Sequence, residues 1–150
     1  MAGTYTNLLY HIVFSTKKRI PLISDNLQQD LYSYLGGIIR GEGGILLEIG
    51  GMADHLHLIA KLKPTKTVSE MLNRIKAKSS KWVNEEKLKM RKFGWQDGYA
   101  AFSASQSQVA SARRYIRNQG IHHLRQSFQD EFKALPERHV VEYDERFLWD

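Results

Sequence analysis

The sequence predicts an α+β fold in which helices cover an antiparallel sheet. Several short segments read as strands, of which one alternates strictly between apolar and polar residues, and apolar residues recur at helical spacing in longer segments. These segments follow one another in the order strand, helix, strand, strand, helix, strand. A βαββαβ order predicts a ferredoxin-like sheet with helices on one face, here followed by extra C-terminal helices. The 150 residues contain no linker or repeat and predict a single domain over 1–150.

Four segments are expected to form the sheet. The most regular is HLHLIAKL, in which leucine and alanine side chains on one face alternate with His55 and His57 on the other. The pair Gly50-Gly51 predicts a turn or a bulge after the second strand. The four strands are expected at 8–15, 45–49, 55–62 and 99–105, with a further short strand at about 140–143.

Capping residues predict where the helices begin. Ser24 is expected to cap a helix over about 25–39, and either Thr67 or Ser69 to cap the next helix. Ser107 is expected to cap a third helix that reaches about Gln119, and a last helix is expected over about 122–135. The second helix has an apolar stripe made of Val68, Met71, Leu72, Ile75 and Trp82.

The composition excludes several classes of protein. Without cysteine the chain has no disulfide and no thiolate metal site, so any metal ion must be held by nitrogen or oxygen ligands. No signal peptide is visible, and no apolar stretch approaches the roughly 20 residues that span a bilayer. We therefore expect a cytoplasmic protein without a membrane partner. Neither a Walker A motif nor a dinucleotide-binding glycine motif is present, so we expect no nucleotide cofactor.

Positive charge is concentrated in one part of the chain. Residues 61–92 contain eleven basic and three acidic residues, whereas the whole chain has a net charge of +6. Within the second predicted helix, helical spacing places Arg74, Lys78 and Lys81 in one stripe beside the apolar stripe. We call these three residues the basic ridge and expect them to bind DNA phosphates. The alternative is a solvated, lysine-rich helix face.

His55 and His57 are the first candidates for chemistry. Because side chains two residues apart on a strand point to the same face, the two imidazoles lie side by side. They can bind one divalent metal ion or converge on one phosphate, although a lone His-x-His is also common in ordinary cores. Asp54 can fix a ring tautomer through a hydrogen bond, or simply occupy a turn.

Tyr115 is the candidate nucleophile. It lies on the third predicted helix, and Gln119, one helical turn later, projects from nearly the same face. Neighbouring cations attract DNA phosphates and favour the phenolate; they are Arg113, Arg114 and Arg117. The alternative is a tyrosine that packs at a helix edge with its hydroxyl in water. His122 and His123 are weaker candidates for metal ligands.

These residues and their order resemble the single-tyrosine HUH transposases of the insertion sequence 200/605 type. "HUH" denotes His, a hydrophobic residue and His, which matches His55-Leu56-His57. Tyr115 matches the tyrosine of that family, and Gln119 matches its third metal ligand. The resemblance spans nearly the whole chain and is carried by residues 10–23, 50–82, 93–105 and 115–123.

The resemblance implies a metal-dependent endonuclease and strand transferase acting on single-stranded DNA. His55, His57 and Gln119 would hold Mg²⁺ or Mn²⁺. Asn118 is the alternative amide, but helical phase favours Gln119, which projects closer to the direction of Tyr115. Tyr115 would attack the scissile phosphate and form a 5′-phosphotyrosyl intermediate, which the 3′-OH of another strand would resolve. Members bind hairpins at the element ends. They are homodimers with a merged sheet, in which the tyrosine helix of one subunit can complete the metal site of the other.

Two alternatives to transposition follow from the same residues. The first is a domesticated relative that performs the same chemistry on repeated palindromes of the host genome. The second is a non-catalytic nucleic-acid-binding module with a ferredoxin-like sheet, which would bind DNA without any metal-dependent adduct.

Overall fold

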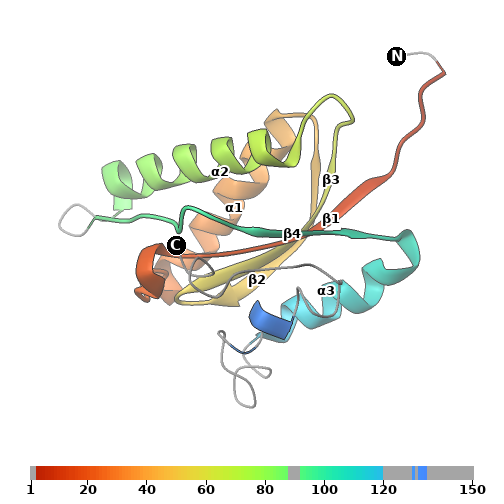
Figure 1. Ribbon diagram of the computed structural model, residues 1–150. Coiled ribbons are helices and arrows are strands. Elements are labelled where there is room, and N and C mark those ends of the chain that lie inside the picture. The colour runs from red at the N-terminus through yellow and green to blue at the C-terminus, as the bar shows by residue number, and fades with distance from the viewer. Residues whose placement is uncertain (1–2, 88–91, 120–129, 131, 135–150) are drawn as a thin grey trace.

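The computed structural model describes residues 3–87, 92–119, 130 and 132–134, and its centre is a four-stranded antiparallel sheet. Strands β1 (Leu8–Ser15), β2 (Ile45–Met52), β3 (His55–Leu62) and β4 (Ala100–Ala104) lie in the order β2-β3-β1-β4. The βαββαβ order is completed by α1 (Asp25–Gly41) and α2 (Val68–Trp82), and α3 (Val109–Arg117) follows β4 (Figure 1). The predicted α+β, ferredoxin-like fold is confirmed.

The sheet separates the helices into two layers. Helices α1 and α2 cover one face, while α3 packs against β2 and β3 on the other (Figure 1). The main core lies under α1 and α2, where Phe14 of β1 and Leu58 of β3 meet Leu35 and Ile75 of the two helices. A smaller cluster on the opposite face joins Val13, Phe102 and Phe132. Each strand therefore supplies one row of side chains to the core and one row to the layer of α3.

Local hydrogen bonds explain where the helices begin. The Ser24 hydroxyl oxygen accepts the Leu27 N–H at 3.2 Å, and the Thr67 oxygen accepts the Glu70 N–H at 3.1 Å. Thr67, rather than Ser69, therefore caps α2. The expected cap of the third helix was wrong: Ser107 lies inside a 3₁₀ turn, Gln106–Gln108, that leads into α3, and Ser105 precedes this turn as its cap.

The second strand also differs from the prediction. Gly50 and Gly51 do not form a turn, because β2 continues through both glycines to Met52. The register shifts between Leu46 and Glu48, which places the bulge earlier in the strand. The turn itself is formed by residues 53 and 54, directly before His55. This arrangement pairs Gly50 with His57 across the two strands.

The remaining expectations concern segments that the structure describes only in part. Of the helix expected at 122–135, residues 130 and 132–134 are described and are helical. The strand expected at 140–143, together with His122 and His123, lies outside the described residues. Within the described part of the chain, no helix is both long enough and apolar enough to cross a bilayer.

Candidate active site on the sheet

The two histidines of β3 lie on the face that α3 covers. The side chains of Leu56, Leu58 and Ala60 belong to the core under α1 and α2. Strand alternation therefore turns His55 and His57 to the opposite face, where both are completely buried and their ring centroids are 5.4 Å apart. The predicted side-by-side placement of the two imidazoles is present in the structure.

His55 is held between an acid and an amide. Its Nδ1 lies 2.8 Å from Oδ1 of Asp54, and its Nε2 lies 3.2 Å from Oε1 of Gln119. A carboxylate accepts hydrogen bonds only, so Asp54 fixes the ring hydrogen of His55 on Nδ1. The other ring nitrogen, Nε2, faces the buried side chain of Gln119.

A third histidine, His11 of β1, completes the cluster. Its Nε2 lies 2.9 Å from Nδ1 of His57, and the two ring centroids are 5.2 Å apart. In the antiparallel pairing His11 lies directly opposite Ile59. Its ring reaches diagonally to His57, which lies two residues before Ile59 on the same face of β3. The sequence reading missed His11. A pairing of β1 with β3 would have revealed it, because odd-numbered residues of both strands share one face.

Tyr115 lies directly over this cluster. Its ring centroid is 5.7 Å from that of His57 and 6.4 Å from that of His11, in both cases edge to face. Gln119, four residues later, reaches His55. A single helical face of α3 thus brings a phenol and an amide onto the histidines of the same chain. Asn118, the alternative amide, is exposed.

A glycine allows α3 to come this close to the sheet. A Cβ atom at Gly50 would lie only 2.5 Å from the backbone oxygen of Ile116, which is one residue after Tyr115. Ile116 is itself fully buried against the sheet. Gly50 pairs with His57 in the neighbouring strand, so the close contact is made beside the histidine over which Tyr115 lies.

The arginines around Tyr115 have different partners. Glu48 of β2 lies 3.0 Å from Nε of Arg117 and 3.6 Å from Nε of Arg113, so both side chains link α3 to the sheet. Arg114 is exposed on the helix. Of the three predicted DNA-binding arginines, the structure therefore gives two a second role in holding α3.

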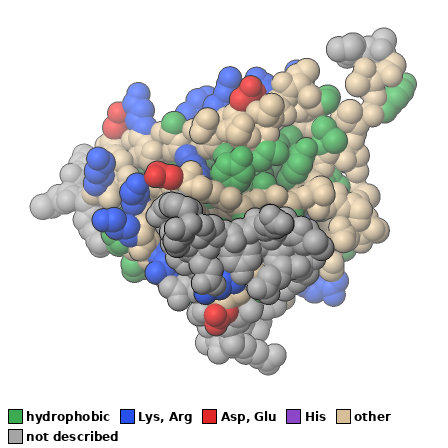
Figure 2. All heavy atoms as spheres, in the orientation of Figure 1, with side chains coloured by type: hydrophobic (Ala, Val, Ile, Leu, Met, Phe, Trp, Pro, Cys, Tyr) green, Lys and Arg blue, Asp and Glu red, His purple; other side chains and the backbone are tan. Residues whose placement is uncertain are grey.

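The basic ridge is not part of this cluster. Helix α2 covers the other face of the sheet, and Figure 2 shows Lys and Arg side chains over it. Glu42 at the end of α1 lies 2.6 Å from Arg74, 3.3 Å from Lys66 and 3.9 Å from Lys78. The hydrogen bond from Arg74, more than any other contact, lowers the pKa of Glu42. Lys81 is exposed. Two residues of the basic ridge, Arg74 and Lys78, therefore form ion pairs with Glu42 of the same chain.

The donor atoms at His55, His57 and Gln119 suit a small divalent cation. Among the described residues no three His, Cys, Asp or Glu side chains form a group that could hold a metal ion, and the ligand set predicted from the sequence contains two imidazoles and one amide. An imidazole nitrogen of His55 and the amide oxygen of Gln119 lie 3.2 Å apart, so these two potential ligand atoms already converge.

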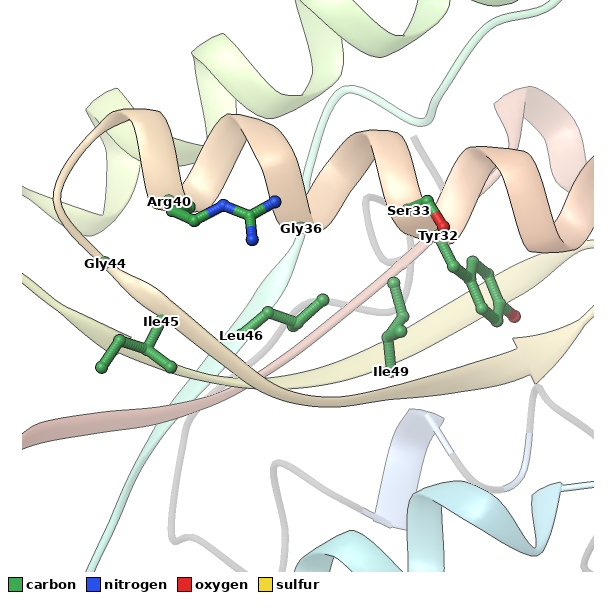
Figure 3. Close-up of a pocket in the computed structure, with 8 residues that line it drawn as sticks. All are labelled: Tyr32, Ser33, Gly36, Arg40, Gly44, Ile45, Leu46 and Ile49. Carbon is green, nitrogen blue, oxygen red and sulfur yellow. The ribbon is translucent and has the colours of Figure 1, made fainter.

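A groove of about 470 Å³ lies elsewhere on the molecule, between α1 and β2. Figure 3 shows Arg40 and Tyr32 on the α1 side, with Leu46 and Ile49 of β2 opposite them. Burial raises the pKa of Tyr32 to about 12. None of the histidines, Tyr115 or Gln119 lines this groove, so it is separate from the candidate active site.

Comparison with known proteins identifies the family. A family model described as "Transposase IS200 like" matches residues 4–119, which include β1, both histidines of β3, Tyr115 and Gln119. The chain belongs to the IS200-like transposase family. Transposases cleave DNA and transfer its strands, so this IS200-like transposase is an enzyme of that class.

Individual relatives agree with this assignment. The transposase for insertion sequence element IS200 of Salmonella typhimurium is 29% identical over 79% of this chain and 81% of its own length. The ISDra2 transposase TnpA of Deinococcus radiodurans is 24% identical over 78% of this chain and 87% of its own length.

Two solved structures share the fold. A transposase from Deinococcus radiodurans described as putative superposes with a TM-score of 0.62 and 22% identity, over 79% of this chain and 95% of its own. A REP-associated tyrosine transposase bound to a REP hairpin superposes with a TM-score of 0.59 and 14% identity, over 82% and 73% of the two chains.

Proposed function

We propose that this transposase cuts and rejoins single-stranded DNA with Tyr115 as its nucleophile. The observation that carries the proposal is the position of α3, which lays Tyr115 over His57 and brings Gln119 to His55. A phenol, two imidazoles and an amide thereby lie close together on one face of the sheet, which supports their use as nucleophile and metal ligands. The fold of the family, by itself, would not require these four side chains to meet.

The proposed reaction proceeds through two balanced displacements. The phenolic oxygen of Tyr115 loses its proton and attacks the scissile phosphorus, and the P–O3′ bond breaks to give a 5′-phosphotyrosyl link and a free 3′-OH. The 3′-OH of a second strand then attacks the same phosphorus and releases the tyrosine, which recovers a proton. Because the covalent link retains the phosphodiester energy, rejoining needs no ATP.

His55, His57 and Gln119 would hold the divalent cation, Mg²⁺ or Mn²⁺. When bound, it supplies a Lewis acid that polarises the scissile phosphate. The chain's own contribution is orientation: Asp54 fixes the His55 ring so that Nε2 faces Gln119, and burial excludes water from both imidazoles. Two imidazoles and one amide form a neutral set, which leaves positions for phosphate oxygens.

The proposed DNA partner is a single-stranded hairpin at the element ends. A REP-associated relative of the same fold has been solved with a REP hairpin, which supports this kind of substrate. The basic ridge and Arg114 are the proposed phosphate contacts, together with the parts of Arg113 and Arg117 that Glu48 leaves exposed. We also propose a homodimer. Because α3 lies on its own sheet here, one subunit contains all four site residues.

The decisive experiment uses a hairpin-containing single strand with Mn²⁺ or Mg²⁺. The full-length protein should form a covalent protein–DNA adduct that migrates slowly on a denaturing gel. Tyr115→Phe should abolish the adduct while hairpin binding in a mobility-shift assay stays unchanged. An adduct that persists in Tyr115→Phe would show that another residue is the nucleophile.

A second variant separates chemistry from binding. His57→Ala should retain hairpin binding but lose the adduct at every metal concentration. An equal loss of binding and cleavage would instead indicate that His57 is a structural residue. Tight hairpin binding by the wild-type protein, without any metal-dependent adduct, would favour the non-catalytic nucleic-acid-binding module.

A further inference from the structure

His11 contacts the candidate active site without belonging to the proposed ligand set. It is 9% exposed, and its ring lies against both His57 and Tyr115, at centroid distances of 5.2 and 6.4 Å. Its Nε2 and Nδ1 of His57 are 2.9 Å apart, a hydrogen-bond distance. A hydrogen bond between two neutral imidazoles needs one hydrogen between the facing nitrogens, so this contact couples the tautomers of the two histidines.

We propose that His11 is a positioning residue that keeps the ring hydrogen of His57 on Nδ1 and thereby presents the Nε2 lone pair of His57 to the active site. In this arrangement Nδ1–H of His57 donates to Nε2 of His11, whose own hydrogen lies on Nδ1. A free neutral imidazole in water favours the opposite tautomer, with hydrogen on Nε2, which cannot be a ligand through that atom. The inference rests on the proposed function, since a lone pair at Nε2 matters only if His57 binds a cation.

The structure gives His11 and Asp54 equivalent tasks. Asp54 binds Nδ1 of His55 at 2.8 Å, and His11 binds Nδ1 of His57 at 2.9 Å. Each proposed histidine ligand therefore has one partner at Nδ1. The two partners come from different places: Asp54 precedes β3 in the turn, whereas His11 is on the neighbouring strand, one diagonal step away.

The position also explains why an imidazole is used. An acceptor at this point has to lie beside both His57 and the Tyr115 ring while it is almost completely buried. A carboxylate there would place a negative charge beside a phenol that has to accept a phosphate. An imidazole accepts a hydrogen bond without adding charge, and its ring also forms part of the wall against which Tyr115 packs.

The test compares three variants of the full-length protein. His11→Phe retains a flat ring but has no acceptor, whereas His11→Gln returns an acceptor oxygen close to the position of Nε2. Val13→Ala is the control, because Val13 pairs directly with His57 and is fully buried, yet makes no hydrogen bond to its ring. Long-range ¹H–¹⁵N NMR spectra, recorded without metal, report the tautomer of His57 in each protein.

We expect the Nδ1–H tautomer of His57 in the wild type, in His11→Gln and in Val13→Ala, and a shift toward Nε2–H in His11→Phe. Calorimetric titration with Mn²⁺ should show affinity about 10- to 100-fold weaker in His11→Phe and near normal in His11→Gln. Adduct formation by His11→Phe should recover when the Mn²⁺ concentration is raised, which the loss of a purely structural residue would not allow.

The outcomes separate this inference from the proposed function. An unchanged His57 tautomer and unchanged Mn²⁺ affinity in a folded His11→Phe would overturn the role of His11 while leaving Tyr115 as the nucleophile. A wild-type protein that binds no Mn²⁺ and forms no adduct would instead overturn the proposed function, and the NMR spectra would still decide whether His11 sets the tautomer.

Discussion

Gly50→Ala tests whether the close approach of α3 to the sheet creates the active site. The backbone of Gly50 has no positive φ, so alanine can adopt its conformation, and the substitution acts through space alone. The added Cβ would lie 2.5 Å from the backbone oxygen of Ile116, 3.1 Å from its Cγ2 and 3.2 Å from its carbonyl carbon. A backbone oxygen cannot rotate away as a flexible side chain can, so α3 itself has to move.

The size of this movement follows from the distances. Ordinary contact begins at 3.4 Å, so α3 has to retreat from β2 by about 0.9 Å. Overpacking of this kind costs about 1–3 kcal/mol of stability. The same movement separates Gln119 from His55 and lifts Tyr115 from His57. Because a misplacement of about 1 Å can slow a reaction about 100-fold, we expect a similar loss in the rate of adduct formation.

The assay measures single-turnover adduct formation on the hairpin strand, together with hairpin binding and thermal unfolding. Gly37→Ala is the matched control, since a Cβ at Gly37 meets nothing within 4 Å. Alanine inside α1 should leave the rate unchanged and stabilise the protein by up to about 1 kcal/mol. A Gly50→Ala protein with the wild-type rate and melting temperature would refute the docking of α3 described above.

Three further predictions concern charged residues. Asp54→Ala should weaken Mn²⁺ binding about 10- to 100-fold in calorimetry because His55 loses the acceptor at Nδ1, whereas Asp97→Ala, at an exposed position, should not change it. Since the folded-state pKa of Glu42 is lowered, its contribution to stability is present at neutral pH and lost as the pH falls through that pKa. Glu42→Gln should therefore melt below the wild type at pH 7, and the difference should shrink in acid; a constant difference would contradict the ion pairs. Replacing the three residues of the basic ridge with alanine should reduce the salt dependence of hairpin binding. Three full phosphate contacts would contribute about 2 to the slope of log K against log salt concentration. We expect a smaller reduction, because Glu42 already pairs with Arg74 and Lys78. An unchanged salt slope would show that the ridge does not contact DNA.

Most of the fold could be predicted because its patterns are local. The β-forming residues of β1, the alternation in β3, the helical spacing in α1 and α2, and the hydroxyl caps Ser24 and Thr67 all act within a few residues. Gly50 and Gly51 were misread as a turn because their reason lies elsewhere in the chain: one accommodates α3, and the other the backbone of β3. A glycine that is required by a distant close approach has the same local appearance as a turn glycine.

The site could be predicted only where one element carries several of its residues. Strand alternation places His55 and His57 on one face, and one helical turn places Tyr115 and Gln119 on one face. No other site residue lies on β1 beside His11. Its diagonal contact with His57, 46 residues later in the sequence, follows from the pairing of β1 with β3. The charge pattern misled in a related way, because it showed the excess of lysine and arginine but not that Glu42 and Glu48 pair with several of them.

Glu48 relates the predicted DNA contacts to the position of the nucleophile. Its carboxylate meets Arg113 and Arg117, which flank Tyr115 on α3, so the cations that would attract phosphate also hold the tyrosine helix on the sheet. A phosphate that binds these arginines competes with Glu48, whereas Gly50, Ile116 and Gln119 hold α3 by contacts that do not depend on charge. Because these contacts do not involve Glu48, we expect Tyr115 to stay over His57 when a phosphate displaces Glu48 from the two arginines.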